Sequence, residues 1–187
     1  MYQICVSGAA KGKSVDEGRD LARAAGKAIA QAGHTLMTGA TIGLPYEAAK
    51  GYTAAKGRMS LGLSPGASKV EHVMKYRLPT DAYDAILYSG LHYVGRDALL
   101  IQSSDAVVSI GGRLGTLHEF TIAMETNTPI GFLQGAGGVS SQIMDVLHAA
   151  GRAKSDDVIF ETDPIRLINK LTAVLNRINK PYIDLYK

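Results

Sequence analysis

The stretch Asp105-Ala106-Val107-Val108-Ser109-Ile110-Gly111-Gly112-Arg113-Leu114-Gly115-Thr116-Leu117-His118-Glu119 decides the fold. A short apolar run, residues 106–110, ends in a glycine-rich turn, and a helical pattern begins at Thr116. Glycine lets the backbone turn tightly and approach a ligand without a Cβ in the way. The unpaired N–H groups at the start of the following helix carry partial positive charge, which favours phosphate. The stretch therefore predicts a strand, a phosphate-binding turn and a helix.

A carboxylate stands beside this turn. Glu119 follows Thr116 by three residues, so both side chains project from one helical face at the rim of the turn. This arrangement indicates binding of a nucleotide, or chemistry on one. The same spacing also fits a capping box, with Thr116 as the N-cap. A capping box does not require Gly111, Gly112 and Gly115 immediately before it, which favours the phosphate interpretation.

Working outward, apolar runs alternate with helix-period segments along the whole chain. Strands that are almost continuously apolar predict a parallel sheet covered on both faces. The fold class is therefore α/β: a doubly wound, Rossmann-like, mostly parallel sheet of six to seven strands with helices on both faces, in a single domain spanning residues 1–187. Ligands of such sheets bind at the carboxyl ends of the strands, where the strand order reverses. We expect strands at residues 2–7, 34–38, 59–63, 85–88, 106–110, 129–133 and 158–160, helices at residues 15–32, 46–56, 94–103, 116–126, 140–150 and from 164 onward, and an irregular stretch at 64–80.

Local signals predict where several helices begin and end. Ser14 and Glu17 have the spacing of a capping box at the start of the first helix. Gly33 is placed to cap the end of that helix. Asp163, followed by a proline, predicts the N-cap of the last helix.

Composition bounds the class of protein. The chain has 187 residues, of which 46% are hydrophobic and 20% charged, as in ordinary globular domains. Cys5, the single cysteine, lies in an apolar run, which predicts inert core packing and a reducing, cytoplasmic setting. A net charge of +3 without Lys/Arg blocks favours an anionic small ligand over nucleic acid. No apolar run approaches the roughly 18 residues of a membrane span, and the chain begins on a strand without a signal peptide, so we expect no membrane partner and a cytoplasmic location.

A second glycine-rich segment, Ser7-Gly8-Ala9-Ala10-Lys11-Gly12-Lys13-Ser14, approaches a nucleoside-triphosphate P-loop. That motif requires a glycine five residues before Gly12, where Ser7 stands, and Gly8 is one place too late. A P-loop enzyme, which would hydrolyse ATP with magnesium, stays a third hypothesis. The first turn is nevertheless placed to line a nucleotide pocket through Ser7, Gly8 and Lys11.

Other chemistries lack their motifs. No Gly-x-Gly-x-x-Gly follows the first strand, which argues against a nicotinamide or flavin cofactor. The five histidines show no metal-ligand spacing and no cysteine pair exists, so no metal site is expected. The nucleophile motif Gly-x-Ser-x-Gly is missing as well. Arg96, on the helix before the central strand, is suited to gripping a phosphate or a carboxylate, although a solvated helix arginine is the ordinary alternative.

At these residues the chain resembles the Lonely Guy family of Rossmann-like nucleotide-binding proteins. Some members are cytokinin riboside 5′-monophosphate phosphoribohydrolases, and others were once called lysine decarboxylases. The family signature is an arginine, an aspartate nine places on, and then Pro-Gly-Gly-x-Gly-Thr-x-x-Glu. Arg96 and Asp105 keep that spacing, and residues 111–119 match the motif in register. Residues 38–43 and 63–66 resemble two further segments of the family, so the resemblance extends over residues 2–133.

The chain also departs from the signature at three places. Gly111 replaces the proline, Arg113 replaces a glycine, and Asp97 replaces the lysine that follows the motif arginine. A glycine in the first position resembles the branch that contains molybdenum-cofactor carrier proteins. Retention of Arg96 and Glu119 favours an enzyme, whereas the three changes favour a carrier.

The resemblance implies a function and a set of residues. It implies that Arg96 and Glu119 are catalytic in a nucleoside 5′-monophosphate phosphoribohydrolase, in which Glu119 would stabilise the oxocarbenium-like transition state or activate water. No metal and no redox cofactor is implied, and a homodimer or higher oligomer is common in the family. The alternative is a non-catalytic protein that binds a nucleotide or the molybdenum cofactor. In either case, the residues expected to bind the ligand are Ser7, Gly8, Thr38, Gly39, Gly43, Gly111, Gly112, Arg113, Gly115 and Thr116.

Overall fold

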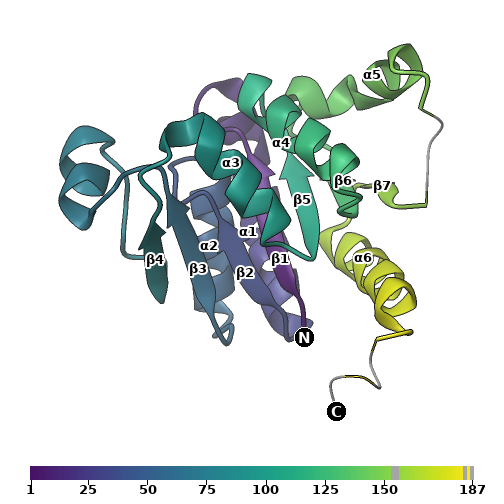
Figure 1. Ribbon diagram of the computed structural model, residues 1–187, viewed down its shortest axis with the longest axis horizontal. Coiled ribbons are helices and arrows are strands. Elements are labelled where there is room, and N and C mark those ends of the chain that lie inside the picture. The colour runs from purple at the N-terminus through teal and green to yellow at the C-terminus, as the bar shows by residue number, and fades with distance from the viewer. Residues whose placement is uncertain (153–155, 183–184, 186–187) are drawn as a thin grey trace.

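A computed structural model describes residues 1–152, 156–182 and 185 of the chain. Within them a seven-stranded sheet is parallel throughout and has the strand order β4-β3-β2-β1-β5-β6-β7 (Figure 1). The prediction of a doubly wound parallel sheet of six to seven strands is confirmed. The strands are β1 (Gln3–Gly8), β2 (Thr35–Thr38), β3 (Ser60–Ser64), β4 (Ala85–Tyr88), β5 (Ala106–Ile110), β6 (Ile130–Leu133) and β7 (Val158–Glu161).

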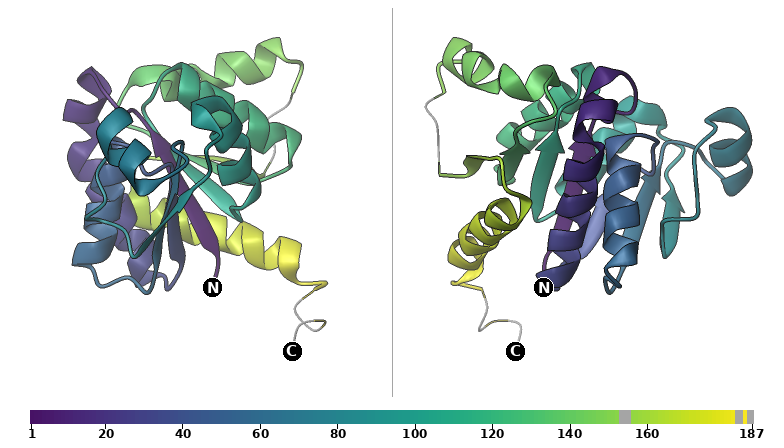
Figure 2. Two further views of the ribbon diagram at one scale, coloured as in Figure 1. Left: turned by 60° about the vertical axis from the view of Figure 1, so that its left-hand side comes forward. Right: turned by 180° about the vertical axis from the view of Figure 1, so that it is seen from behind.

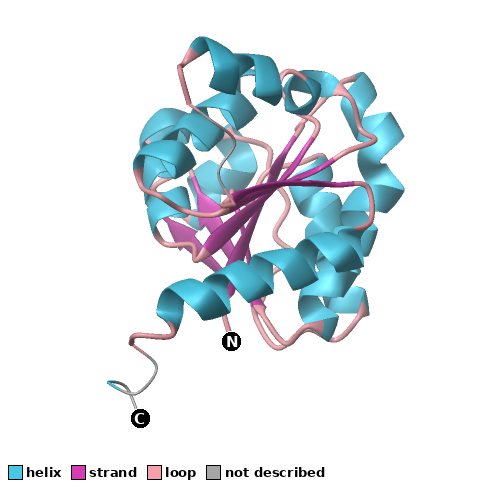
Figure 3. Ribbon diagram, turned by 90° about the vertical axis from the view of Figure 1, so that its right-hand side faces the viewer, coloured by secondary structure: helices cyan, strands magenta, loops and turns pink. Residues whose placement is uncertain are grey.

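Helices cover both faces of the sheet, as Figure 3 shows. One face carries α1 (Lys13–Gln31), α2 (Leu44–Ala54) and α6 (Pro164–Asn179), which are in front in the right-hand view of Figure 2. The other face carries α3 (His92–Gln102), α4 (Leu114–Glu125) and α5 (Ile143–Ala149). The stretch 64–80, expected to be irregular, contains a single π-helical turn, Glu71–Lys75, and a 3₁₀ turn, Gly138–Ser141, precedes α5.

Two hydrophobic cores follow from the alternation of side chains along the strands. Ile4 and Val6 of the central strand β1 face α1 and α2, whereas Cys5 between them faces the α3 and α4 side. Cys5 is fully buried, as expected from its apolar run, and burial raises the pKa of its thiol. Each fully buried aliphatic side chain contributes roughly 1.5–3 kcal/mol. Because the central strands β1 and β5 are apolar on both faces, they must lie inside the sheet rather than at an edge.

Two glycines allow α1 and α2 to lie unusually close together. A Cβ added at Gly26 would lie 1.9 Å from the carbonyl oxygen of Ala48, and one at Gly51 would lie 2.1 Å from that of Arg23. Any side chain at these positions would push the two helices apart. The close contact matters for the site because α2 begins beside the end of β1.

The predicted helix caps have mixed outcomes. Gly33, with φ 73°, follows α1, and its N–H donates to the carbonyl of Ala30, so it closes the helix as expected. The Asp163 carboxylate accepts the N–H of Arg166 at 2.7 Å, which confirms it as the N-cap of α6. The capping box at Ser14 and Glu17 is wrong, because α1 begins at Lys13, two residues earlier than predicted, with Gly12 at the N-cap.

The second predicted capping box is wrong as well. Helix α4 begins at Leu114 with Arg113 at the N-cap, and no side chain caps this end. Thr116 therefore lies inside the first turn, and Glu119 lies about one turn further along α4. Both side chains are buried, and Glu119 reaches Ser7 at the end of β1.

The strand order reverses between β1 and β5. From β1 the chain builds outward through β2 and β3 to β4, and from β5 it builds the other way through β6 to β7. The carboxyl ends of β1 and β5 therefore lie side by side at the crevice where ligands of such sheets bind. Among the described residues, no helix is both long and apolar enough to cross a membrane.

Candidate functional site

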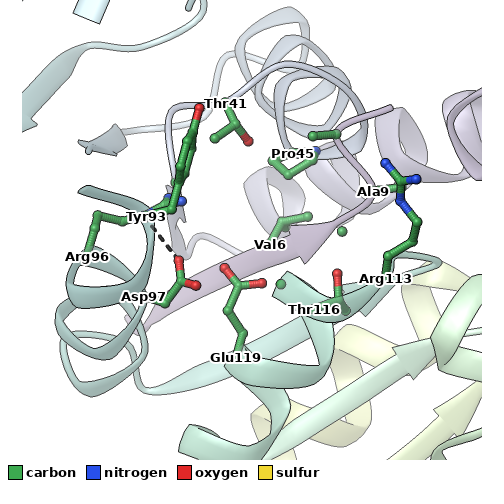
Figure 4. Close-up of a pocket in the computed structure, with 14 residues that line it drawn as sticks. Val6, Ala9, Thr41, Pro45, Tyr93, Arg96, Asp97, Arg113, Thr116 and Glu119 are labelled. Carbon is green, nitrogen blue, oxygen red and sulfur yellow. Dashed lines mark ion pairs between the residues drawn. The ribbon is translucent and has the colours of Figure 1, made fainter. Parts of the chain in front are cut away.

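A cavity of about 250 Å³ opens at the switch point between β1 and β5 (Figure 4). Its walls come from the ends of β1 and β2, the start of α2, helix α3 and the first turns of α4. Seven residues expected at the site line the cavity: Gly8, Gly39, Arg96, Arg113, Gly115, Thr116 and Glu119. Seven further lining residues were not expected: Val6, Ala9, Ala10, Thr41, Pro45, Tyr93 and Asp97.

Glu119 lies in the middle of the cavity wall in Figure 4. Its side chain is buried, and its Oε2 accepts a short hydrogen bond from the Ser7 hydroxyl at the end of β1. Burial, reinforced by the negative charge of Asp97, raises the pKa of Glu119 to about 7, although Ser7 and Arg96 act in the opposite direction. At neutral pH the group is therefore divided between the carboxylate and the carboxylic acid.

Arg96 is held inside the protein rather than displayed in solvent. It is only 4% exposed, and its Nη1 donates to the carbonyl oxygen of Leu63 at 3.4 Å. Its Nε lies 3.3 Å from Asp97 Oδ1, the ion pair dashed in Figure 4, but makes no hydrogen bond. A Cβ at Gly39 would lie 1.5 Å from Arg96 Nη1, so Gly39 makes room for the guanidinium.

Asp97 is the charged residue of the cavity lining that was not expected at the site from the sequence. It is 6% exposed, lines the cavity, and accepts a hydrogen bond from His118 Nδ1 at 3.1 Å through Oδ2. The signal that could have found it is its position directly after Arg96, where the resembled family has a lysine. At this position the chain therefore has an acidic side chain beside Glu119, where the resembled family has a basic one.

The opposite end of the cavity is cationic. Arg113 lies across Glu119 from Asp97 in Figure 4 and forms the N-cap of α4. The uncapped N–H groups of this twelve-residue helix add partial positive charge at the same place. A Cβ at Gly115 would meet nothing within 4 Å, so the space in front of this turn is open.

Two of the expected binding residues shape the loops instead of lining the cavity. The Thr38 hydroxyl accepts the N–H of Ala40 and donates to the Tyr83 hydroxyl, each at 3.0 Å. Gly43, with φ 81°, caps α2, and a Cβ there would lie 2.3 Å from the carbonyl oxygen of Ala9. Both residues therefore support the wall that Thr41 and Pro45 present to the cavity.

Gly111 and Gly112 also shape a turn. They have φ values of 59° and 97°, which favour glycine. Their carbonyl oxygens accept hydrogen bonds from the Ser140 hydroxyl at 2.6 Å and the Val139 N–H at 2.9 Å. The two glycines thus turn the chain from β5 into α4 and anchor the 3₁₀ turn, and they do not line the cavity. Ser7 acts through Glu119, and Lys11 is exposed outside the lining.

Comparison with known proteins assigns the family. The model of the SLOG cluster4 family matches residues 1–168. The chain belongs to the SLOG cluster4 family. The expected resemblance to the Lonely Guy and molybdenum-cofactor-carrier branch is thereby confirmed. An uncharacterised protein of Archaeoglobus fulgidus is 30% identical over 134 residues, which cover 72% of this chain and 81% of that protein.

Solved structures share the fold of this SLOG cluster4 protein. The molybdenum cofactor carrier protein of Chlamydomonas reinhardtii is 27% identical with a TM-score of 0.72, and the match covers 92% of this chain and 98% of the other. The molybdenum cofactor binding protein of Rippkaea orientalis has a TM-score of 0.73 at 24% identity, covering 93% and 97%. The second match shows the common fold alone.

Proposed function

We propose that this SLOG cluster4 protein binds a small molecule that carries a phosphate group, a nucleotide or a phosphorylated pterin of the molybdenum-cofactor type, and holds it without converting it. The observation that carries the proposal is the cavity at the switch point, with the Arg113 guanidinium and the uncapped start of α4 at one end. Backbone N–H groups at a helix start and a nearby guanidinium together suit a phosphate. The carrier named in Chlamydomonas reinhardtii, at 27% identity, supports the same class of ligand.

The state of the two expected catalytic residues supports binding over catalysis. Arg96 is engaged by the Leu63 carbonyl and by Asp97, and Glu119 is engaged by Ser7. A catalytic carboxylate that must stabilise an oxocarbenium-like centre acts best when fully ionised. With its pKa raised to about 7 by burial, Glu119 carries only part of that charge at neutral pH.

Calorimetric titration with ribose 5-phosphate tests the phosphate end directly. We expect binding to the native protein and a loss of about tenfold in affinity for Arg113→Ala, because one charge-assisted contact is removed. Arg166→Ala, which removes an exposed arginine of α6 outside the cavity lining, is the matched control and should bind as the native protein does. Failure of ribose 5-phosphate, of all nucleoside monophosphates and of the phosphate ester of 6-hydroxymethylpterin to bind would overturn the proposal.

A phosphoribohydrolase is the second candidate, favoured by one observation. A buried carboxylic acid with a pKa of about 7 is poised to give a proton to a leaving base at neutral pH. In that reaction the N-glycosidic bond breaks, the water oxygen bonds to the anomeric carbon, and the base leaves with a proton. Incubation with nucleoside monophosphates and assay of free base and ribose 5-phosphate decides the matter. If the native protein releases free base and the Glu119→Gln variant does not, the protein is a hydrolase and the proposal of a carrier is overturned.

A further inference from the structure

The two ends of the cavity differ in chemical character. Arg113 and the start of α4 form a cationic end, whereas Asp97 and Glu119 form an acidic end on the other side in Figure 4. Tyr93 lies over the acidic end and is half exposed, with Arg96 5.9 Å from its ring centroid. A ligand that fills the cavity must therefore present an anion at one end and hydrogen-bond donors, on a group flat enough to pack against an aromatic ring, at the other.

The acidic end offers acceptors that are fixed in position and not fully used. Asp97 is held by Arg96 at 3.3 Å and by His118 at 3.1 Å. Glu119 is held through Oε2 by Ser7, and its Oε1 has no hydrogen-bond partner among the described residues. A carboxylate oxygen accepts more than one hydrogen bond, so both acids have capacity for ligand N–H groups.

A donor lies beside these acceptors. The Nε–H of Arg96 is ion-paired with Asp97 Oδ1 at 3.3 Å but makes no hydrogen bond, although the residue is 4% exposed and lines the cavity. The hydrogen-bonding capacity of this buried N–H is therefore left unused among the described residues, and a ligand acceptor could take it up. The wall thus presents one donor next to acidic acceptors.

This order of groups complements one edge of a heterocycle. A 2-amino-4-oxopyrimidine ring, as in guanine or a pterin, shows a carbonyl oxygen followed by a ring N–H and an amino group. The carbonyl suits Arg96, and the two neighbouring donors suit a carboxylate. Adenine shows the reverse order, an amino donor and then a bare ring nitrogen, which would face the carboxylates without a proton between them.

We propose that Asp97, together with Glu119, determines specificity by accepting the N–H groups of a ligand with a 2-amino-4-oxopyrimidine edge. The inference rests on the proposed binding of a phosphorylated small molecule in this cavity. It would explain why Asp97 occupies the position at which the resembled family has a lysine. The phosphate lies at Arg113, and the ring lies under Tyr93 against the acidic end.

Matched ligand pairs test the inference on the native protein. Guanosine and adenosine 5′-monophosphate share the phosphate and ribose, and we expect the guanine nucleotide to bind about tenfold more tightly or better. The phosphate ester of 6-hydroxymethylpterin and its 2-oxo lumazine analogue form the second pair. A preference in either pair supports edge recognition, and the pair in which it appears identifies the source of the ring.

Ribose 5-phosphate separates this inference from the proposed function. If ribose 5-phosphate binds while neither pair shows a preference, or adenine is preferred, the phosphate site stands and the edge recognition is overturned. If ribose 5-phosphate, the nucleoside monophosphates and the pterin phosphate ester all fail to bind, the proposed function itself is overturned.

The variant Asp97→Asn localises the effect. We expect the preference within the responding pair to fall to about threefold or less, because half of the acceptor becomes a donor, while ribose 5-phosphate binds as before. Glu47→Gln is the matched control, since Glu47 is a buried, ion-paired acid of α2 outside the cavity lining. An undiminished preference in folded Asp97→Asn would overturn the role of Asp97.

Proton release gives a second readout that needs no variant. The groups facing Glu119 are Cys5 and Ser7 from β1, Arg96 and Asp97 from α3, and His118 from α4. Ligand N–H groups at Glu119 favour its carboxylate, so the guanine or pterin ligand should release more protons at pH 7 than its partner. Calorimetry in two buffers of different ionisation enthalpy measures the difference. Equal release within the responding pair would contradict contact with Glu119.

Discussion

Two glutamates of this protein are buried at 9% and 5% exposure, yet their environments push their pKa values apart. For Glu119, burial and the charge of Asp97 raise the pKa to about 7. Burial also raises the pKa of Glu47, but hydrogen bonds from Arg23 at 2.7 Å and Lys50 at 3.3 Å outweigh it, so the pKa lies below its ordinary value. The charge of a buried acid is therefore set by its partners.

This contrast predicts opposite effects of removing each acid on stability. Between pH 4.5 and about 7 the folded protein holds a proton on Glu119 that the unfolded chain loses, so this group lowers the free energy of unfolding as the pH rises. The free energy of unfolding of Glu119→Gln, relative to that of the native protein, should therefore increase from pH 5 to pH 8 by up to about 3 kcal/mol. Urea unfolding at a series of pH values measures this difference.

Glu47→Gln is the control of opposite sign. It should be less stable than the native protein at pH 7, and its deficit should shrink as the pH falls through the lowered pKa of Glu47. A difference between Glu119→Gln and the native protein that stays constant with pH would contradict the raised pKa.

At the scale of elements, the turn from β5 into α4 depends on glycine at one position but not at another. Gly112 has φ 97°, and a Cβ there would lie 2.0 Å from Thr116 Oγ1. Gly115, in the first turn of α4, has nothing within 4 Å of the place of a Cβ. The two glycines stand three residues apart, so they form a matched pair for substitution by alanine.

We expect Gly112→Ala to destabilise the protein by roughly 2 kcal/mol or more, because the left-handed backbone and the clash with Thr116 both oppose a side chain. Gly115→Ala should be neutral or stabilising by about 0.5–1 kcal/mol, the helix preference of alanine over glycine. Urea denaturation of both variants checks the pair. Equal destabilisation by the two substitutions would contradict the role assigned to the Gly112 backbone.

The elements themselves were largely predictable, but helix starts were not. Apolar runs located every strand of the observed sheet, since buried parallel strands leave that trace in sequence. The capping boxes at Ser14 and Thr116 misled because both helices start earlier, at Lys13 and Leu114, where the chain leaves the strand ends. Tertiary geometry at the sheet edge overrode a local pattern of two residues.

The cavity lining was predictable in part from the motif. Arg96 and Glu119, 23 positions apart in the sequence, both line the cavity, while the catalytic roles that the resemblance implied stay a prediction. Asp97 and Tyr93 were not expected there, because they line the cavity only through the packing of α3 on the sheet. Gly111 and Gly112 were expected to hold phosphate but form the turn, a distinction that depends on the partners of their carbonyl groups.

At the scale of the whole molecule, His34 joins the start of β2 to α6. Its Nε2 lies 2.8 Å from the Thr172 hydroxyl, which itself donates to the Ile168 carbonyl, so Nε2 carries the proton. Nδ1 is buried without a partner, and the Tyr2 ring packs alongside. Burial and the N-terminal amine lower the pKa of His34, although Asp105 acts in the opposite direction.

This lowered pKa predicts a loss of stability in acid. Below about pH 6.5 the unfolded chain takes up a proton on His34 that the folded protein resists, so this group lowers the free energy of unfolding as the pH falls. His34→Gln should lower the free energy of unfolding by about 1 kcal/mol near pH 7.5. Between pH 7.5 and pH 5 the stability of this variant should fall less than that of the native protein. His148→Gln, at an exposed position of α5, is the control. Parallel pH profiles for the native protein and His34→Gln in thermal unfolding would contradict the prediction.

The pairing of β1 with β5 has a consequence for the protein during its synthesis. Ile4 is paired with Ala106, and Ser7 reaches a glutamate 112 positions later. A nascent chain can pair β1 with β2 early, but its central seam stays open until β5 has been translated. A product that terminates before α4 would lack Thr116 and Glu119 and could not form the cavity between β1 and β5.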